Sequence, residues 1–148
     1  MYKIEQMRAS MNKNKALAPV LLFLGALLAA TSVILGAFGA HGLKNVLSVA
    51  SLNTFEIGVR YQMYHALGVL VLPALSGYVQ VAWLKRVAIA FITGCVLFSG
   101  SLYALAITGF KWLGPITPIG GIFFIAGWGM LAFALLRSPQ VKKADNDK

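Results

Sequence analysis

The stretch LAPVLLFLGALLAATSVILGAFGA, residues 17–40, decides the fold, because it runs for 24 residues without a charged side chain. A helix of that length rises about 36 Å, enough to cross about 30 Å of hydrocarbon. The basic segment before it, residues 1–16, also fits the start of a secretory signal peptide, but the apolar part of a signal peptide usually has about 7–15 residues. We therefore expect residues 17–40 to form a transmembrane helix.

The composition of the whole chain agrees with this prediction. Hydrophobic residues make up 59% of the 148 residues, charged residues only 11%, and the mean hydropathy is +0.77. A water-soluble domain has about 25% charged residues, so the excess apolar surface must face lipid. The length allows one membrane domain with two short tails. Cys95 is the single cysteine, which excludes an intramolecular disulfide.

Three more spans are expected, at about 61–84, 87–110 and 117–136, each bounded by basic residues or prolines. Pro73 is expected to kink the second of them. Apolar residues recur at near-helical spacing over 43–60, which predicts a short amphipathic helix at the outer membrane surface. The predicted fold is an all-α membrane protein with four transmembrane helices in an antiparallel bundle. Its domains are a basic tail at 1–16, the helical domain at 17–137 and a polar tail at 138–148.

The basic residues predict the orientation in the membrane. Ten Lys and Arg residues flank the ends that would lie beside the two tails, against three (Lys44, Arg60 and Lys111) at the opposite ends. The positive-inside rule therefore places both termini in the cytoplasm of a multi-pass protein of the cell (inner or plasma) membrane. The formal net charge of +9 is spread over tails and short loops, so we expect lipid headgroups and not nucleic acid as its counterpart.

Four stretches stand out from ordinary lipid-facing sequence: LGAFGAHGL at 35–43, VRYQMYHALGVL at 59–70, LFSGSLYALA at 97–106 and ITPIGGIFFIAGWGML at 116–131. In their order and spacing, over about 17–137, they resemble the YgdD and YwdK family of small multi-pass membrane proteins, which has no assigned molecular function. The resemblance implies a location in the cell membrane and a four-span fold. It implies no catalytic residues.

The polar side chains of these stretches and of the segment before the second span are predicted to lie near the outer membrane boundary, at the ends of their helices. The candidate outer polar cluster consists of His41, Glu56, Arg60, Tyr61, Gln62, His65, Ser99, Tyr103 and Thr117. We expect His41, Arg60, Tyr61, His65 and Tyr103 to approach one another. Such residues either hold helices together by hydrogen bonds or line a binding cavity.

Glycines and histidines in these motifs each have two interpretations. Small residues at three- and four-residue spacing favour tight helix packing over a phosphate-binding loop, since no strand and no Lys-Ser pair accompanies them. The packing residues are Gly36, Gly39, Gly42, Gly120 and Gly121.

Two histidines with no His-x3-His or Cys-x2-Cys spacing do not make a metal site, so we expect neither a metal nor a cofactor.

The sequence leaves three classes of function open. The favoured one is a non-enzymatic structural or accessory subunit, whose partners are the bilayer and either another membrane protein or a second copy. The second is a protein that binds or transports a small solute or a lipid- or quinone-like ligand at a polar site at the outer membrane boundary. Proton-coupled transport is disfavoured, because no acid falls within the predicted spans. The third is an enzyme acting on a lipid or quinone-like substrate, with His65 or His41 as general base and Arg60 as anion clamp. No second carboxylate is present to orient a histidine, and no nucleophile is evident beyond Ser99 and Ser101.

Overall fold

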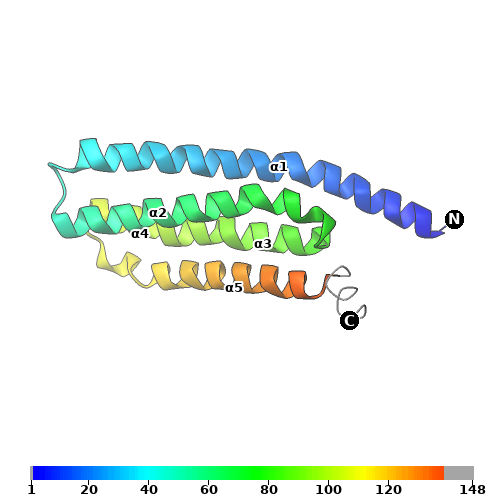
Figure 1. Cartoon of the computed structure of the whole chain (residues 1–148). Helices are drawn as coiled ribbons and strands as arrows, with labels where there is room; N and C mark the ends of the chain where they lie inside the picture. Colours follow the sequence, from blue (N-terminus) through cyan, green and yellow to red (C-terminus); the bar gives the residue numbers. More distant parts are fainter. Residues whose placement is uncertain (1, 139–148) are drawn as a thin grey trace, which may run out of the picture.

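The computed structural model describes the backbone of residues 2–138 and side chains from residue 17 onward. All regular elements in this range are helical. They form four helical rods, and consecutive rods run in opposite directions. The start of the first rod and the end of the last rod lie at the same end of the molecule (Figure 1). The elements are α1 (Tyr2–Phe38), η1 (Gly39–Leu43), α2 (Val49–Val71), η2 (Leu72–Gly77), α3 (Val81–Gly94), η3 (Cys95–Ser99), α4 (Gly100–Thr108), η4 (Lys111–Leu113) and α5 (Ile116–Leu136).

The first rod contains the stretch from which the fold was predicted. Within it, Leu17–Leu43 is long and apolar enough to cross a membrane, and its last turn, η1, is a π-helical turn that directly continues α1. Pro19 lies inside α1. A proline is tolerated in a membrane helix when neighbouring groups satisfy the carbonyl that it leaves free. The apolar run predicted at 17–40 is thus confirmed as helix and extends three residues further.

The second rod corrects the prediction. A surface helix at 43–60 followed by a span at 61–84 was expected, but α2 is one unbroken helix, Val49–Val71. The hydroxyl of Ser48 accepts a hydrogen bond from the backbone amide of Ser51, which caps its start. Near its end, Pro73 lacks an amide hydrogen and does not kink the helix but leads into the 3-10 turn η2. Nothing near residue 60 breaks the helix, so the polar and apolar parts form a single rod.

The third rod is built from α3, the π-turn η3 and α4, and Val81–Thr108 is also long and apolar enough to span a membrane. It begins six residues before the predicted start at Val87, so Lys85 and Arg86 lie in the first turns of α3 and not in a loop. The pair still lies at the same end of the molecule as the start of α1. Gly109, with a φ of 71°, ends α4 in the left-handed conformation that glycine adopts easily.

The fourth rod, α5, begins one residue before its predicted start. Pro115 is its N-cap residue and Pro118 lies in its first turn, where the backbone amides have no partner within the helix and a proline costs little. Together with the short turn η4, it gives the third membrane-spanning candidate, Lys111–Leu136. Among the described residues these three helices meet the length and apolarity of a span, and α2 does not.

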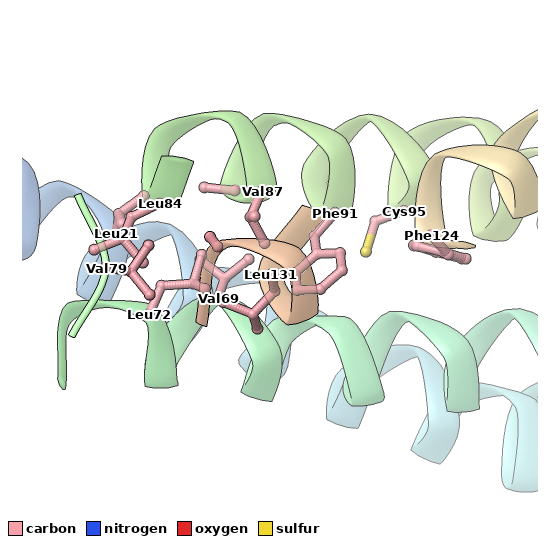
Figure 2. Close-up of a cluster of buried hydrophobic side chains, with 12 residues drawn as sticks. Leu21, Val69, Leu72, Val79, Leu84, Val87, Phe91, Cys95, Phe124 and Leu131 are labelled. Atoms are coloured by element: carbon pink, nitrogen blue, oxygen red, sulfur yellow. The ribbon is translucent and has the colours of Figure 1, made fainter. Parts of the chain in front are cut away.

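The rods pack in sequence order. α1 lies along α2, α2 lies along η3 and α4, and α5 lies along α3 and η3. The main core, shown in Figure 2, joins Leu21 of α1, Val69 of α2, Phe91 and Cys95 of the third rod, and Phe124 of α5. A smaller cluster of Leu43, Phe55 and Ala106 closes the opposite end. Because α1 is covered mainly by α2, its outer face is the least buried of the spans.

The predicted packing glycines differ in what surrounds them. Gly120 of α5 lies directly against the backbone of Phe98 in η3, where even a methyl group would overlap it, while the adjacent Gly121 has ordinary space. Gly36 and Gly39 of the first rod face the side chains of Val59 and Phe55 on α2. Gly42 faces a side chain of its own rod, Phe38. Three of the five glycines thus lie where two rods meet closely.

Candidate functional site

Gln62 lies at the centre of a hydrogen-bond network that joins three rods. Its amide nitrogen donates to the backbone oxygen of Leu28, at 2.9 Å, and to the hydroxyl of Thr31, at 2.8 Å, both on α1. Its amide oxygen accepts from the hydroxyl of Tyr103 on α4, at 3.0 Å. A polar group without partners is costly in an apolar medium, and Gln62 is only 6% exposed. These three bonds therefore fix the side chain and tie α1, α2 and α4 together.

Two further hydrogen bonds link neighbouring rods. The hydroxyl of Ser32 on α1 donates to the backbone oxygen of Val59 on α2, at 2.9 Å. The hydroxyls of Ser101 on α4 and Thr117 on α5 lie 2.7 Å apart, and Ser101 also donates to the backbone oxygen of Phe98. Hydrogen bonds of this kind between helices are a common means of assembly within a membrane.

His65 uses both of its ring nitrogens. Nδ1 lies 2.8 Å from the backbone oxygen of Tyr61, which can only accept, and Nε2 accepts from the indole nitrogen of Trp128 on α5, at 3.2 Å. This pair of partners fits the neutral ring with its proton on Nδ1. A second proton, on Nε2, would face the N–H of the indole. The arrangement therefore holds His65 as a neutral hydrogen-bonding bridge between α2 and α5.

Aromatic rings enclose the imidazole. The ring of Phe124 stacks on it, with centroids 3.4 Å apart and planes 8° from parallel, and Phe91 meets it edge-on at 5.2 Å. Tyr61 stacks at 6.3 Å on the same helix and also packs on Phe98 at 4.6 Å. The histidine is 4% exposed. Its surroundings are those of a core residue.

The depth of His65 differs from the prediction. The residue lies sixteen positions after the start of α2 at Val49, which corresponds to about 24 Å along the helix axis. It was expected at the outer membrane boundary, because the second span was expected to begin at Tyr61. Since α2 begins twelve residues earlier, Gln62 and His65 lie well inside the rod bundle.

Glu56 and Arg60 lie on the surface of α2, so Glu56 is part of a rod and not of a separate surface helix. The guanidinium Nη2 lies 4.0 Å from the carboxylate Oε2, and Nε donates to the backbone oxygen of Glu56 at 3.4 Å. Their side chains are 50% and 58% exposed, so the pair is loose and open. With Gly36, Gly39, Phe55 and Val59 they line a groove of about 240 Å³ between the first two rods.

Two predicted site residues stand apart from these networks. His41 is exposed in η1, and within the residues that the structure describes its ring forms no hydrogen bond, ion pair or ring contact. Ser99 is fully buried in the π-turn η3, and its hydroxyl has no partner in the described part of the chain. The structure thus brings together Tyr61 with His65 and Gln62 with Tyr103, and leaves His41 outside.

Several residues of the networks were not predicted. Thr31 and Ser32 are the only two hydroxyl side chains in the uncharged run 17–40, and that isolation was a usable signal. Trp128 lies in the quoted stretch 116–131, but an indole in an apolar helix gives no sign of its partner. The contact with His65 depends on how α5 is rotated, which the sequence alone does not define.

In the part of the chain that the structure describes, no group of three or more His, Cys, Asp or Glu side chains lies close enough together to bind a metal ion. Nδ1 and Nε2 of His65 already have partners, and Cys95 is buried among apolar side chains. Among the described residues the buried side chains of Ser32, Gln62, His65 and Ser101 therefore serve as contacts between rods, while the buried hydroxyls of Ser99 and Ser138 have no hydrogen-bond partner.

Several long apolar helices, with interior polar groups that bond across from helix to helix, define a small multi-pass membrane protein. The chain belongs to the DUF423 family, described as a protein of unknown function, whose profile matches residues 35–121. This confirms the resemblance noted from the sequence motifs.

Named relatives support the same assignment. A UPF0382 membrane protein of Staphylococcus saprophyticus is 48% identical over 120 residues, which cover 80% of this chain and 98% of the relative. The UPF0382 membrane protein YwdK of Bacillus subtilis is 42% identical over 119 residues, covering 80% and 97%. A relative from Haemophilus influenzae is 42% identical over 106 residues, covering 72% and 85%. No solved structure matches the chain.

Proposed function

We propose that this protein is a non-enzymatic structural or accessory subunit of the cell membrane. In this proposal all four rods cross the bilayer, α2 included, and both termini are cytoplasmic. The observation that carries it is the bonding of Gln62 and His65: both polar atoms of the Gln62 amide, and Nε2 of His65, bond to other rods. These two buried side chains thus hold the bundle together.

The bonding of His65 argues against a role in acid-base catalysis. A general base needs a free nitrogen lone pair within reach of a substrate proton. The lone pair on Nε2 points at the indole N–H of Trp128, and aromatic rings surround the imidazole. A substrate would have to displace Trp128 and separate α2 from α5.

The outer face of α1 is the surface by which such a subunit would assemble. Only 17% of the most apolar window of this span is buried, against 50% for Val81–Thr108. Large side chains along it point away from the other rods, including Phe23 at 66% and Ile34 at 65% exposure. Packing between membrane helices rests on such side-chain contacts, so this face can take another helix as well as lipid.

Site-specific photo-crosslinking in native membranes tests the proposal. A photoreactive residue at Ile34 on α1 should yield a discrete adduct with another membrane protein or a second copy, identifiable by mass spectrometry. The matched control is Ile125 on α5, which is 74% exposed. We expect Ile125 to yield lipid adducts only. If Ile34 also yields lipid adducts only, the assembly role is refuted.

A further inference from the structure

The Glu56–Arg60 groove differs from the interior networks because its charges are open to the surroundings. Each side chain is at least half exposed, and the shortest distance between the ions is 4.0 Å, at the limit of an ion pair. An ionisable side chain within a membrane costs free energy unless an opposite charge or a hydrogen-bonding group is bound to it. Such residues are therefore candidates for a functional site. A loose, exposed pair leaves hydrogen-bonding capacity on both ions for a ligand.

The depth of the groove places it among lipid headgroups and the upper part of the acyl chains. Glu56 lies seven residues and Arg60 eleven residues after the start of α2, about 10 and 16 Å along its axis. The three helices apolar enough to span a membrane have 26–28 residues, about 40 Å, and so exceed the hydrocarbon by roughly 5 Å at each end, while α2, with 23 residues, is about 35 Å long. Side chains on a helix lean toward its N-terminus, here toward the membrane surface, which brings both charges nearer to the headgroups.

The two charges have a vertical order. Glu56 lies about 6 Å nearer than Arg60 to the end of the bundle, because four residues separate them on one helix. A zwitterionic phospholipid has the same order, since its phosphate lies deeper in the membrane than its amine. The phosphate would meet Arg60, which binds oxyanions well, and the ammonium would meet Glu56. An anionic lipid without an amine would face the carboxylate of Glu56 with no compensating cation.

We propose that the groove binds a phospholipid with a primary amine, that is, an ethanolamine-type headgroup, in the leaflet at the end of the bundle opposite the termini. The half-buried apolar side chain of Val59 would take the start of an acyl chain, beside Gly36, which has no side chain. This inference goes beyond the proposed subunit role, and it rests on the proposed crossing of the bilayer by α2.

A second copy of the chain is a weaker occupant of this groove. The groove is lined by six residues, and its volume of about 240 Å³ equals that of about eight water molecules. A helix has a diameter of about 10 Å and needs a contact surface several turns long. The volume of the groove is therefore sufficient for a lipid headgroup and too small for a helix.

Lipid binding to the full-length chain can be measured by native mass spectrometry after release from nanodiscs. The discs contain phosphatidylethanolamine, phosphatidylcholine or phosphatidylglycerol with identical acyl chains. We expect the wild type to retain phosphatidylethanolamine preferentially. Arg60→Gln and Glu56→Gln should each weaken that retention about tenfold, as expected for the loss of one charge-assisted hydrogen bond. Lys44→Gln, which removes an exposed cation outside the groove at the same end, should leave it unchanged.

The exchanged double variant, Glu56→Arg with Arg60→Glu, sharpens the test. It keeps two opposite charges four residues apart but reverses their vertical order, so we expect the preference for phosphatidylethanolamine to be lost. Circular dichroism identifies variants that have not folded, and the double variant remains informative if one single variant fails. The proposal would be overturned by equal retention of all three lipids by the wild type, or by an unchanged preference in the exchanged variant. It would also be overturned by protein dimers that are lost when the charges are removed, since a second copy would then occupy the groove.

Discussion

The indole nitrogen of Trp128 on α5 donates a hydrogen bond to Nε2 of His65 on α2 across 3.2 Å. These residues are 63 positions apart in the sequence and belong to two rods that both pack against the third rod. The bond therefore links α2 directly with α5 across the interior, and its removal should be measurable.

Replacing Trp128 by phenylalanine removes the donor and leaves Nε2 of His65 without a partner. We expect Trp128→Phe to reduce the free energy of unfolding in detergent micelles by about 1 kcal/mol, the typical size of such bonds in membrane proteins. Trp112→Phe is the control, since Trp112 is 67% exposed. Equal losses of stability in the two variants would show that the hydrogen bond contributes nothing.

The hydrogen bond between Tyr103 and Gln62 can be isolated by a double-mutant cycle. Tyr103→Phe and Gln62→Leu each remove one partner, and the double variant removes both. We expect the single variants to be destabilised and the double variant to lose about 0.5–1 kcal/mol less than their sum. Strictly additive losses, measured by the same unfolding assay, would mean that the two side chains do not interact.

Gly120 and Gly121 offer a pair of adjacent positions with opposite expectations. A methyl group at Gly120 would overlap the backbone of Phe98, so Gly120→Ala should destabilise the protein by about 1–3 kcal/mol. At Gly121 the nearest atoms, in the ring of Phe98, are at ordinary contact distance, so Gly121→Ala should be close to neutral. Thermal unfolding of the two variants in the same detergent compares them, and similar melting temperatures would argue against the tight α5–η3 contact.

The orientation in the membrane stays a prediction and has a direct test. A reporter that is active only outside the cytoplasm should be active when fused after Leu52 or Lys111 and inactive after Lys143, because the positive-inside rule places the basic ends in the cytoplasm. An enzyme active only in the cytoplasm should give the opposite pattern. Activity of the first reporter at Lys143 would contradict the proposed topology.

Hydrophobicity predicted the helical rods because an uncharged run of more than twenty residues has few alternatives. Boundaries were harder where α2 is polar. The composition of the first half of α2 is typical of a helix at the membrane surface. Only the packing of Phe55 against Gly39 and Tyr103 shows that this half belongs to the bundle. The predicted meeting of His41 with His65 failed for the same reason, since a start of α2 twelve residues earlier moves His65 about 18 Å deeper.

The polarity of α2 also bears on how the chain enters the membrane during synthesis. Among the described helices, three are apolar enough to leave the insertion machinery for lipid on their own, whereas α2 carries Glu56, Arg60, Gln62 and His65. In the proposed four-span topology α2 relies in lipid on α1, which supplies partners for Gln62, and on α5, which supplies the interhelical partner of His65. Insertion in that topology is cooperative, because α2 is held or delivered as a hairpin with α1 until the later helices have been synthesised.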